Sequence, residues 1–196
     1  MLNKVKYEDR TIIGYFENLI SLFRPFTLLL PLMVSLLVMS ASMIYNNISF
    51  NLNFLLTMFI AGITLMLVNA ASNTINQASD WKSDMISKPD RPIPKGAIKV
   101  ADAHSIAFIL FLLALLIAIN MNVTFGIFVF AIAFFSLTYS LPPRIKKYLF
   151  INQIWISIPR GLLGILAAWS VFGNPFNKTP LTIGFMATFF LIGGMA

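Results

Sequence analysis

The sequence predicts an all-α, polytopic transmembrane helical bundle, and three features of its composition support this class. Of the 196 residues, 58% are apolar and only 11% are charged, whereas about 25% are charged in an ordinary soluble domain. A soluble surface of this size would need far more charge. The 19 Phe exclude a disordered chain. Because there is no Cys, disulfides, thiolate metal sites and Cys nucleophiles are also excluded.

Long segments without Asp, Glu, Lys or Arg define about six spans, since about 20 apolar residues cross a hydrocarbon layer of about 30 Å. The first two spans, 25–45 and 54–76, are separated by an Asn-rich turn. Asn120 and Asn122 divide the segment 104–139 into two shorter spans. A fifth span covers 152–172, and a sixth begins near residue 181 and is still apolar at residue 196.

The N-terminal residues 1–22 are predicted to form an amphipathic helix on the membrane surface. Their apolar side chains recur at helical spacing and are Ile12, Ile13, Phe16, Leu19, Ile20 and the adjoining Phe23. Glu8, Asp9 and Glu17 interrupt the segment, so it is not a cleavable signal peptide. The alternative interpretation is a frayed polar leader.

The distribution of basic residues predicts the orientation. Twelve of the 14 basic residues precede the first span, or lie between the second and third, or between the fourth and fifth. With six spans, these three segments fall on one side, and basic segments stay in the cytoplasm. The sequence therefore predicts an integral protein, in the cell membrane, with a cytoplasmic N-terminus. The net charge of +7 faces that side, and no nucleic-acid partner is expected.

A row of polar residues runs through the end of the second span. Asn69, Asn73, Asn76, Asp80 and Asp84 are spaced by four, three, four and four residues, which places them on one face of a helix. Polar groups inside a membrane are costly and usually face a cavity or a partner. Two carboxylates one turn apart repel each other unless a cation lies between them.

These residue types favour a metal–phosphate site at the membrane face. Oxygen ligands without nearby His or Cys suit Mg²⁺ or Ca²⁺, and Mg²⁺ completes its shell with water and phosphate oxygens. Lys88, Arg91 and Lys95 follow closely on a Pro-rich loop and are placed to hold that phosphate. The alternative interpretation is a solvated helix end with ordinary loop charges.

Two motifs resemble those of the UbiA-type intramembrane prenyltransferases. Asn76, Asp80 and Asp84, followed by the segment 86–96 (ISKPDRPIPKG), are similar to the family's first Asp-rich motif and its tail. The segment 139–146 (YSLPPRIK) looks like the one that ends the family's fourth helix, and Arg24-Pro25 resembles the start of its first. The resemblance covers essentially the whole chain and implies a single membrane-embedded domain, 1–196, of a nine-helix fold.

The resemblance implies transfer of a polyprenyl group from its diphosphate to a hydrophobic or aromatic acceptor within the bilayer, with Mg²⁺ as cofactor. It assigns Asp80, Asp84 and Asn76 as ligands of the metal. The catalytic residues that it implies are Asp80, Asp84 and Tyr139. The ring of Tyr139 would stabilise positive charge on the substrate. The residues that it implies for substrate binding are Asn73, Asn76, Lys88, Arg91, Ser140, Arg144 and Lys146.

The chain departs from the family pattern in two respects. Gln77 stands where many members have Asp. The family's second Asp-x-x-x-Asp motif is missing, because only Asp90 and Asp102 follow Asp84. We therefore expect a chain that is incomplete at its C-terminus, holds half of the metal site and is inactive alone.

Three alternatives compete with this interpretation. An alcohol phosphotransferase of phospholipid synthesis would need Asp-Gly and Ala-Arg between its aspartates, which are absent here. A transporter or channel would need further polar residues facing the row, and the first, third and fourth spans are nearly bare of them. A non-catalytic homologue is the third.

Arg160 lies inside the fifth span, where an Arg marks a substrate-binding or a structural pairing role. Pro159 and Gly161 predict a helix break beside it.

Overall fold

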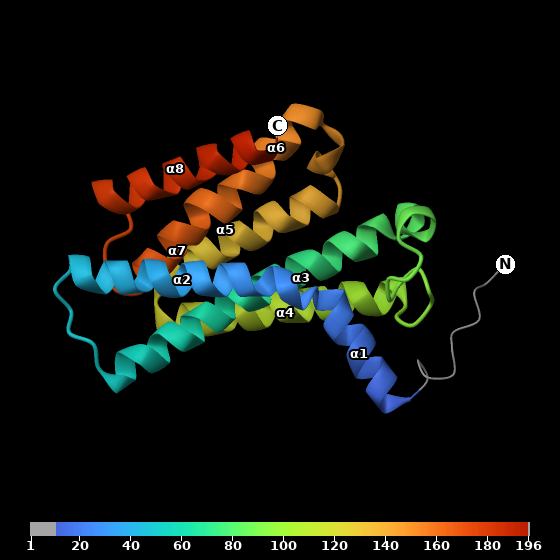
Figure 1. Ribbon diagram of the computed structural model, residues 1–196, viewed down its shortest axis with the longest axis horizontal. Helices are drawn as coiled ribbons and strands as arrows, with labels where there is room; N and C mark the ends of the chain where they lie inside the picture. The colour runs from blue at the N-terminus through green and yellow to red at the C-terminus, as the bar shows by residue number, and fades with distance from the viewer. Residues whose placement is uncertain (1–10, 196) are drawn as a thin grey trace.

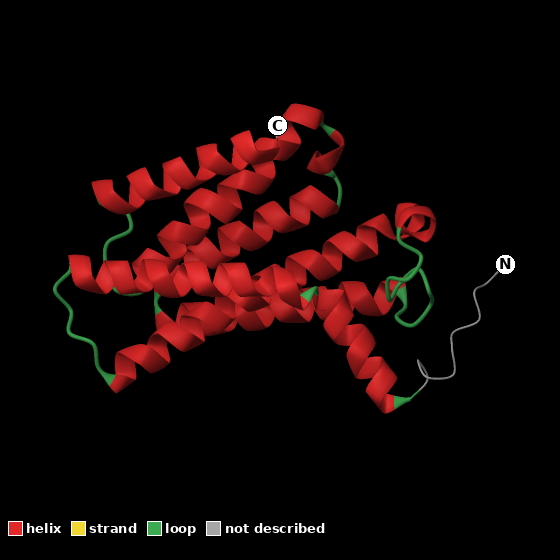
Figure 2. Cartoon of the chain, viewed as in Figure 1, coloured by secondary structure: helices red, strands yellow, loops and turns green. Residues whose placement is uncertain are grey.

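The computed structural model describes residues 11–195, which form helices joined by short loops, with no strand among them (Figure 2). The predicted all-α class is confirmed. Within residues 11–195, five helices are long and apolar enough to cross a membrane. They are α2 (Pro25–Tyr45), α3 (Leu52–Ser87), α4 (Val100–Met121), α5 (Val123–Ser140) and the continuous segment Leu149–Ser170, which comprises α6 (Leu149–Ile158), the π-helical turn η3 (Pro159–Leu163) and α7 (Gly164–Ser170). This last segment does not break at Pro159 and Gly161, as the sequence predicts, but continues through the wider turn η3.

The sixth predicted span corresponds to α8 (Lys178–Met195), which is not among these five. Two shorter elements complete the described part of the chain, α1 (Ile12–Phe23) and the 3-10 turn η2 (Ile145–Lys147). The first ten residues of the predicted amphipathic helix lie outside the described residues. In α1 the large apolar side chains are more than half exposed at Ile12, Ile13, Phe16 and Ile20, and the location of α1 on a membrane surface stays a prediction.

Helix α3 is the centre of the bundle, because it contacts α1, α2, α4, α5 and α7. In Figure 1 the long helices lie side by side, and α8 packs along α6, η3 and α7 at the edge of the bundle away from α4. A 36-residue helix is about 54 Å long at 1.5 Å per residue. Because this exceeds a hydrocarbon layer of about 30 Å, the last turns of α3 extend past the spanning part.

Small residues let the helices approach closely. Helix α4 buries one stripe at Ala103, Ala107, Phe111, Ala114 and Ala118. Its other faces keep Ile109, Leu112 and Leu116 about half exposed. Large apolar side chains on the outside of a helix are costly in water and are favoured in lipid, so this distribution fits a bundle embedded in a membrane.

A single residue joins α4 to α5, which confirms the break predicted near Asn120 and Asn122. Asn122 ends one helix and caps the next, since its Oδ1 accepts a hydrogen bond from the Thr124 N–H at 2.8 Å. Its amide nitrogen also donates to the Ser170 carbonyl at 3.0 Å. The turn is therefore tied to the end of α7.

The loop after α3, the loop after α5 and the α1–α2 junction lie at the same end of the bundle, on the right in Figure 1. These segments carry eight of the 14 basic residues, which are Arg24, Lys88, Arg91, Lys95, Lys99, Arg144, Lys146 and Lys147. The fold therefore gathers the two family-like motifs and the Arg24 turn at one end.

Candidate active site

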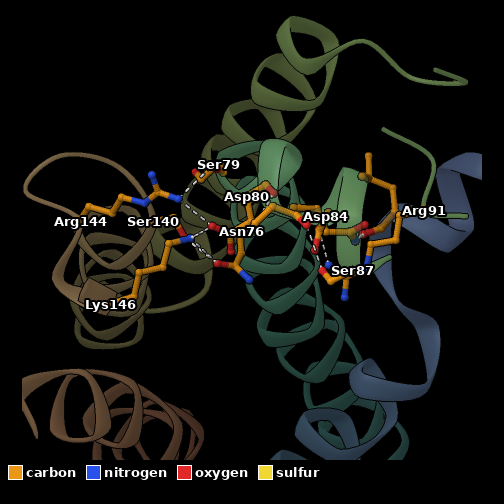
Figure 3. A network of polar contacts seen from close by, with 12 residues as sticks. Asn76, Ser79, Asp80, Asp84, Ser87, Arg91, Ser140, Arg144 and Lys146 are labelled. Carbon is orange, nitrogen blue, oxygen red and sulfur yellow. Dashed lines mark hydrogen bonds and ion pairs between the residues drawn. The ribbon is translucent and has the colours of Figure 1, made fainter. Parts of the chain in front are cut away.

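Asp80 and Asp84 lie on the last turns of α3, and each carboxylate is paired with different basic side chains (Figure 3). Asp80 Oδ1 accepts hydrogen bonds from Arg144 Nη2 at 2.8 Å and from Lys146 Nζ at 2.7 Å. Asp84 Oδ2 accepts from Arg91 Nη1 at 2.5 Å. Repulsion between the two carboxylates is therefore relieved by three cations that come from two separate loops.

The segment after α5 supplies the two cations on Asp80. Arg144 adopts a left-handed backbone conformation, with φ 58°, immediately before η2. This turn aims its guanidinium back at α3, where Nη2 also donates to the Ser79 carbonyl at 3.1 Å. Ser79 is a contact that the motif did not predict, because it involves a backbone oxygen.

Lys146 connects the carboxylate to the other predicted residues of this segment. Its Nζ donates to Asn76 Oδ1 at 2.9 Å and lies 5.8 Å from the centroid of the Tyr139 ring. Ser140 is buried, and its hydroxyl lies 3.5 Å from the same Asn76 oxygen. Burial lowers the pKa of the Lys146 ammonium, while the hydrogen bond to Asp80 opposes that shift.

The loop after α3 supplies the cation on Asp84. Its shape is set by buried apolar side chains, since Ile93 and Ile98 pack in a small core with Leu22 and Ala103. Prolines at 89, 92 and 94 restrict its backbone. Lys88, predicted to bind phosphate, is exposed at the end of α3, where its backbone N–H donates to the Asp84 carbonyl.

The amide side chains of the polar row contact two different parts of the structure, the segment after α5 and the α1–α2 junction. Asn76 faces the segment after α5, whereas Asn73 Nδ2 donates to the Phe23 carbonyl at 2.9 Å and to Thr27 Oγ1 at 2.8 Å. Asn69 Nδ2 donates to the Thr27 carbonyl at 3.0 Å. In this structure Asn73, predicted to bind substrate, contacts the α1–α2 junction.

Gln77 belongs to this second group, a role that the Asp-rich motif does not predict. Its Nε2 donates to the Leu22 carbonyl at 2.6 Å, and its side chain is buried. The signal was available, because Asn69, Asn73 and Gln77 are spaced by four residues. These amides satisfy carbonyls where α1 ends and α2 begins, which would otherwise lack partners. They thereby fix the turn at Arg24, whose φ is 58°.

The oxygen ligands fit Mg²⁺ in type. Two carboxylates and the Asn76 amide oxygen lie on one face of α3, and Mg²⁺ usually takes one or two carboxylates together with water and phosphate oxygens. Residues 11–195 contain no group of three or more His, Cys, Asp or Glu placed to hold a metal. A pocket of about 460 Å³ opens beside Asp80 and is lined by Ser79, Asp80, Trp81, Lys82, Ser83 and Arg144.

Comparison with known proteins decides the family. The family model described as "UbiA prenyltransferase family" matches residues 28–196. The chain belongs to this family. The resemblance drawn from the Asp-rich motif is thereby confirmed, and the helical bundle described above is that of a UbiA family member.

Relatives of this UbiA family chain include several archaeal proteins named digeranylgeranylglyceryl phosphate synthase. The Methanosphaera stadtmanae protein is 28% identical over 131 residues, which cover 67% of this chain and 45% of that protein. The Methanosarcina mazei protein is 42% identical over 60 residues, 31% of this chain and 21% of that protein. A solved structure from work on digeranylgeranylglyceryl phosphate synthase has the same fold, with a TM-score of 0.79 at 22% identity, over 92% of this chain and 61% of that one. The chain thus spans about half the length of these relatives.

Proposed function

We propose that this chain carries a donor-binding site of an intramembrane prenyltransferase. The reaction is transfer of a polyprenyl group from a polyprenyl diphosphate to a hydrophobic acceptor in the membrane. One observation carries the proposal. Cations from two loops converge on two carboxylates at the end of one helix, with Arg91 on Asp84, and Arg144 and Lys146 on Asp80.

The paired arrangement suits a site that binds a charged metal–diphosphate group. Arg91, Arg144 and Lys146 are positioned to hold phosphate oxygens, since guanidinium and ammonium groups make charge-assisted hydrogen bonds to them. Asp80, Asp84 and Asn76 supply the oxygen ligands for Mg²⁺, whose chemistry is to neutralise charge on the departing diphosphate. Lys88 and Ser140 remain proposed donor-binding residues on the basis of the motif.

Tyr139 is proposed to face the carbon from which the diphosphate departs. The Lys146 ammonium already lies 5.8 Å from its ring centroid, a distance at which an aromatic face attracts a cation. Positive charge that develops on an allylic carbon is stabilised in the same way, by roughly 0.5–2 kcal/mol for each ring. The prenyl tail would occupy the apolar space among the helices.

The acceptor is proposed to be a lipid. The relatives in the comparison are named for a product with two geranylgeranyl groups on glyceryl phosphate. Transfer of one prenyl group to a singly prenylated glycerol phosphate is the corresponding reaction. An aromatic acid is the alternative acceptor. We also propose a cell-membrane location with the Asp motif on the cytoplasmic side.

A direct assay tests the function. A version of the protein extended to the length of its relatives is reconstituted in liposomes with tritiated geranylgeranyl diphosphate and a prenylated glycerol phosphate or 4-hydroxybenzoate, with Mg²⁺ or with EDTA. We expect a labelled lipid product that requires Mg²⁺. Asp80→Asn and Asp84→Asn should each lower the rate about a hundredfold or more, since they weaken stabilisation of charge in the transition state.

Asp90→Asn is the matched control, because Asp90 is an exposed carboxylate in the same loop region and should leave the rate unchanged. Normal rates in either Asp80→Asn or Asp84→Asn would refute the ligand assignment. If no acceptor is prenylated while labelled diphosphate crosses the liposome membrane, the transporter interpretation is favoured instead. Absence of turnover in this chain, with turnover in a version extended to the length of its relatives, would support the expectation that the chain is inactive alone.

A further inference from the structure

The Lys146 ammonium holds two of the oxygens that are proposed to bind Mg²⁺. Its Nζ lies 2.7 Å from Asp80 Oδ1 and donates a hydrogen bond to Asn76 Oδ1 at 2.9 Å (Figure 3). The two oxygens come from successive turns of α3 and converge on one nitrogen. A single cation therefore bridges a carboxylate and an amide that share a face of the helix.

An Mg²⁺ ion and this ammonium cannot both occupy the position between the two oxygens. Mg²⁺ requires its oxygen ligands at about 2.0–2.1 Å, which leaves no room there for a nitrogen that is hydrogen-bonded to both. Two cations so close together also repel each other strongly. A metal that takes Asp80 and Asn76 as ligands must therefore displace the side chain of Lys146.

Lys146 is better suited to move than Arg144, the other cation on Asp80. Arg144 is fixed by its left-handed backbone turn, with φ 58°, and by the hydrogen bond from its Nη2 to the Ser79 carbonyl at 3.1 Å. Lys146 carries a compact ammonium on a flexible four-carbon stem. The ammonium can therefore leave the two oxygens without a change in the backbone of η2.

A displaced Lys146 needs a new anionic partner. Its side chain is only 12% exposed, and a largely buried ammonium without a counter-charge is strongly unfavourable. A diphosphate bound beside the metal supplies oxygens for charge-assisted hydrogen bonds. The free-energy cost of moving Lys146 is therefore offset when the donor and the metal bind together, and not when the metal binds alone.

We infer that Lys146 occupies the Mg²⁺ position while no metal is bound, and moves to the donor diphosphate when both ligands bind. This inference rests on the proposed function and adds a coupling between the two ligands. Metal alone competes with the ammonium, so its apparent affinity falls with the fraction of molecules in which Lys146 holds Asp80 and Asn76. The metal and the donor consequently raise each other's affinity, because coupling between two sites is reciprocal.

Metal binding without donor tests the inference apart from turnover. A version of the protein extended to the length of its relatives is placed in phosphatidylcholine nanodiscs, and Mn²⁺, a paramagnetic substitute for Mg²⁺, is titrated by electron paramagnetic resonance. Lys146→Met should bind Mn²⁺ about tenfold more tightly than wild type, because the competing hydrogen bonds of a charged group are removed. At saturating Mg²⁺, the same variant should bind a non-transferable thiodiphosphate analogue of geranylgeranyl diphosphate several-fold more weakly.

Two controls separate this exchange from a general effect of charge. Lys147→Met removes the adjacent, exposed ammonium and should leave the Mn²⁺ affinity unchanged. Lys146→Met combined with Asp80→Asn should lose the gain in affinity, because the proposed metal ligand is itself removed and the two changes are coupled.

If Lys146→Met fails to fold, the wild-type protein carries the test through reductive methylation of lysines, measured by mass spectrometry. Saturating Mg²⁺ alone should raise the labelling of Lys146, because its ammonium is displaced. Mg²⁺ together with the donor analogue should lower that labelling again, whereas labelling of the exposed Lys147 should stay constant.

The inference is overturned if Lys146→Met binds Mn²⁺ no more tightly than wild type, or if Lys147→Met shows the same gain. It is also overturned if Mg²⁺ alone does not raise the labelling of Lys146. Any of these results together with normal prenyl transfer would leave the proposed function intact. A gain in Mn²⁺ affinity without donor binding or transfer would reject the proposed function and support the exchange at Asp80 and Asn76.

Discussion

Individual side chains at the end of α3 have contacts that the motif alone did not specify. The family-like pattern grouped Asn73 and Asn76 as parts of one site, yet Asn76 accepts a hydrogen bond from Lys146 and Asn73 donates one to the Phe23 carbonyl. Gln77, at the position of an Asp in many family members, donates to the Leu22 carbonyl. In this chain its amide nitrogen has a structural partner, so the departure from the motif has a physical explanation.

At the residue scale we predict that restoring the family-like Asp will destabilise this chain. Gln77→Asp removes the N–H donor from a buried hydrogen bond and leaves the Leu22 carbonyl without a partner, which should lower the free energy of unfolding by about 1–3 kcal/mol. Hydrogen exchange should rise in α1. Thermal unfolding in detergent and exchange mass spectrometry provide the measurements.

Asn174→Asp is the control for this amide-to-acid change, because it keeps the oxygen that accepts from the Phe176 N–H. It should unfold like wild type. Wild-type stability together with unchanged protection of α1 in Gln77→Asp would contradict the role assigned to Gln77.

At the element scale, the segment Leu149–Ser170 shows how two helices depend on each other. In its central π-helical turn the Leu162 N–H donates a hydrogen bond to Thr188 Oγ1 of α8. The two backbones approach closely because residue 161 is Gly. The helix and the position of Arg160 are therefore set by packing against α8.

We predict that Gly161→Ala will destabilise the bundle by about 1–3 kcal/mol, because an added methyl group overlaps the backbone of Thr188 and forces the helices apart. Gly193→Ala is a matched control in α8, since a Cβ there meets no atom within 4 Å. It should be neutral or slightly stabilising, as Ala favours helix over Gly. Unfolding in a denaturing detergent series measures both, and equal stability of the two variants would refute the close-packing argument.

At the scale of the whole molecule, the fold gathers its basic loops at the end of the bundle where α3 ends (Figure 1). Asp80 and Asp84 lie in the last turns of α3. The absence of Cys makes the orientation directly measurable, because a single introduced thiol has no competitor. Both ends of α3 offer exposed polar positions, Asn53 and Ser87.

We predict that Ser87→Cys will react with a membrane-impermeant maleimide only in inside-out vesicles, because the basic end faces the cytoplasm. Asn53→Cys, at the other end of the same helix, should react only in intact cells. Labelling of both residues from one side would exclude α3 as a spanning helix, and the reversed pattern would invert the proposed topology.

The helical class, the approximate spans, the clustering of basic residues between them and the family all follow from the sequence alone. These features depend on hydropathy and periodicity along short stretches, which neighbouring residues encode directly. The single polar face of α3 was also predictable, because helical geometry fixes which residues share a side. The count of about six spans was harder to predict, since α8 contains polar residues near its start.

The packed bundle, by contrast, sets which cation pairs with which carboxylate. It also sets which amide side chains of α3 contact the segment after α5 and which contact the α1–α2 junction, and how α8 stabilises the turn at Arg160. The Asp80 and Arg144 side chains are 64 residues apart in the chain, and those of Gln77 and Leu22 are separated by 55. Such contacts depend on the relative positions of packed helices and on backbone turns such as that of Arg144. Local sequence patterns do not encode these distances, so the partners are defined only when the bundle assembles.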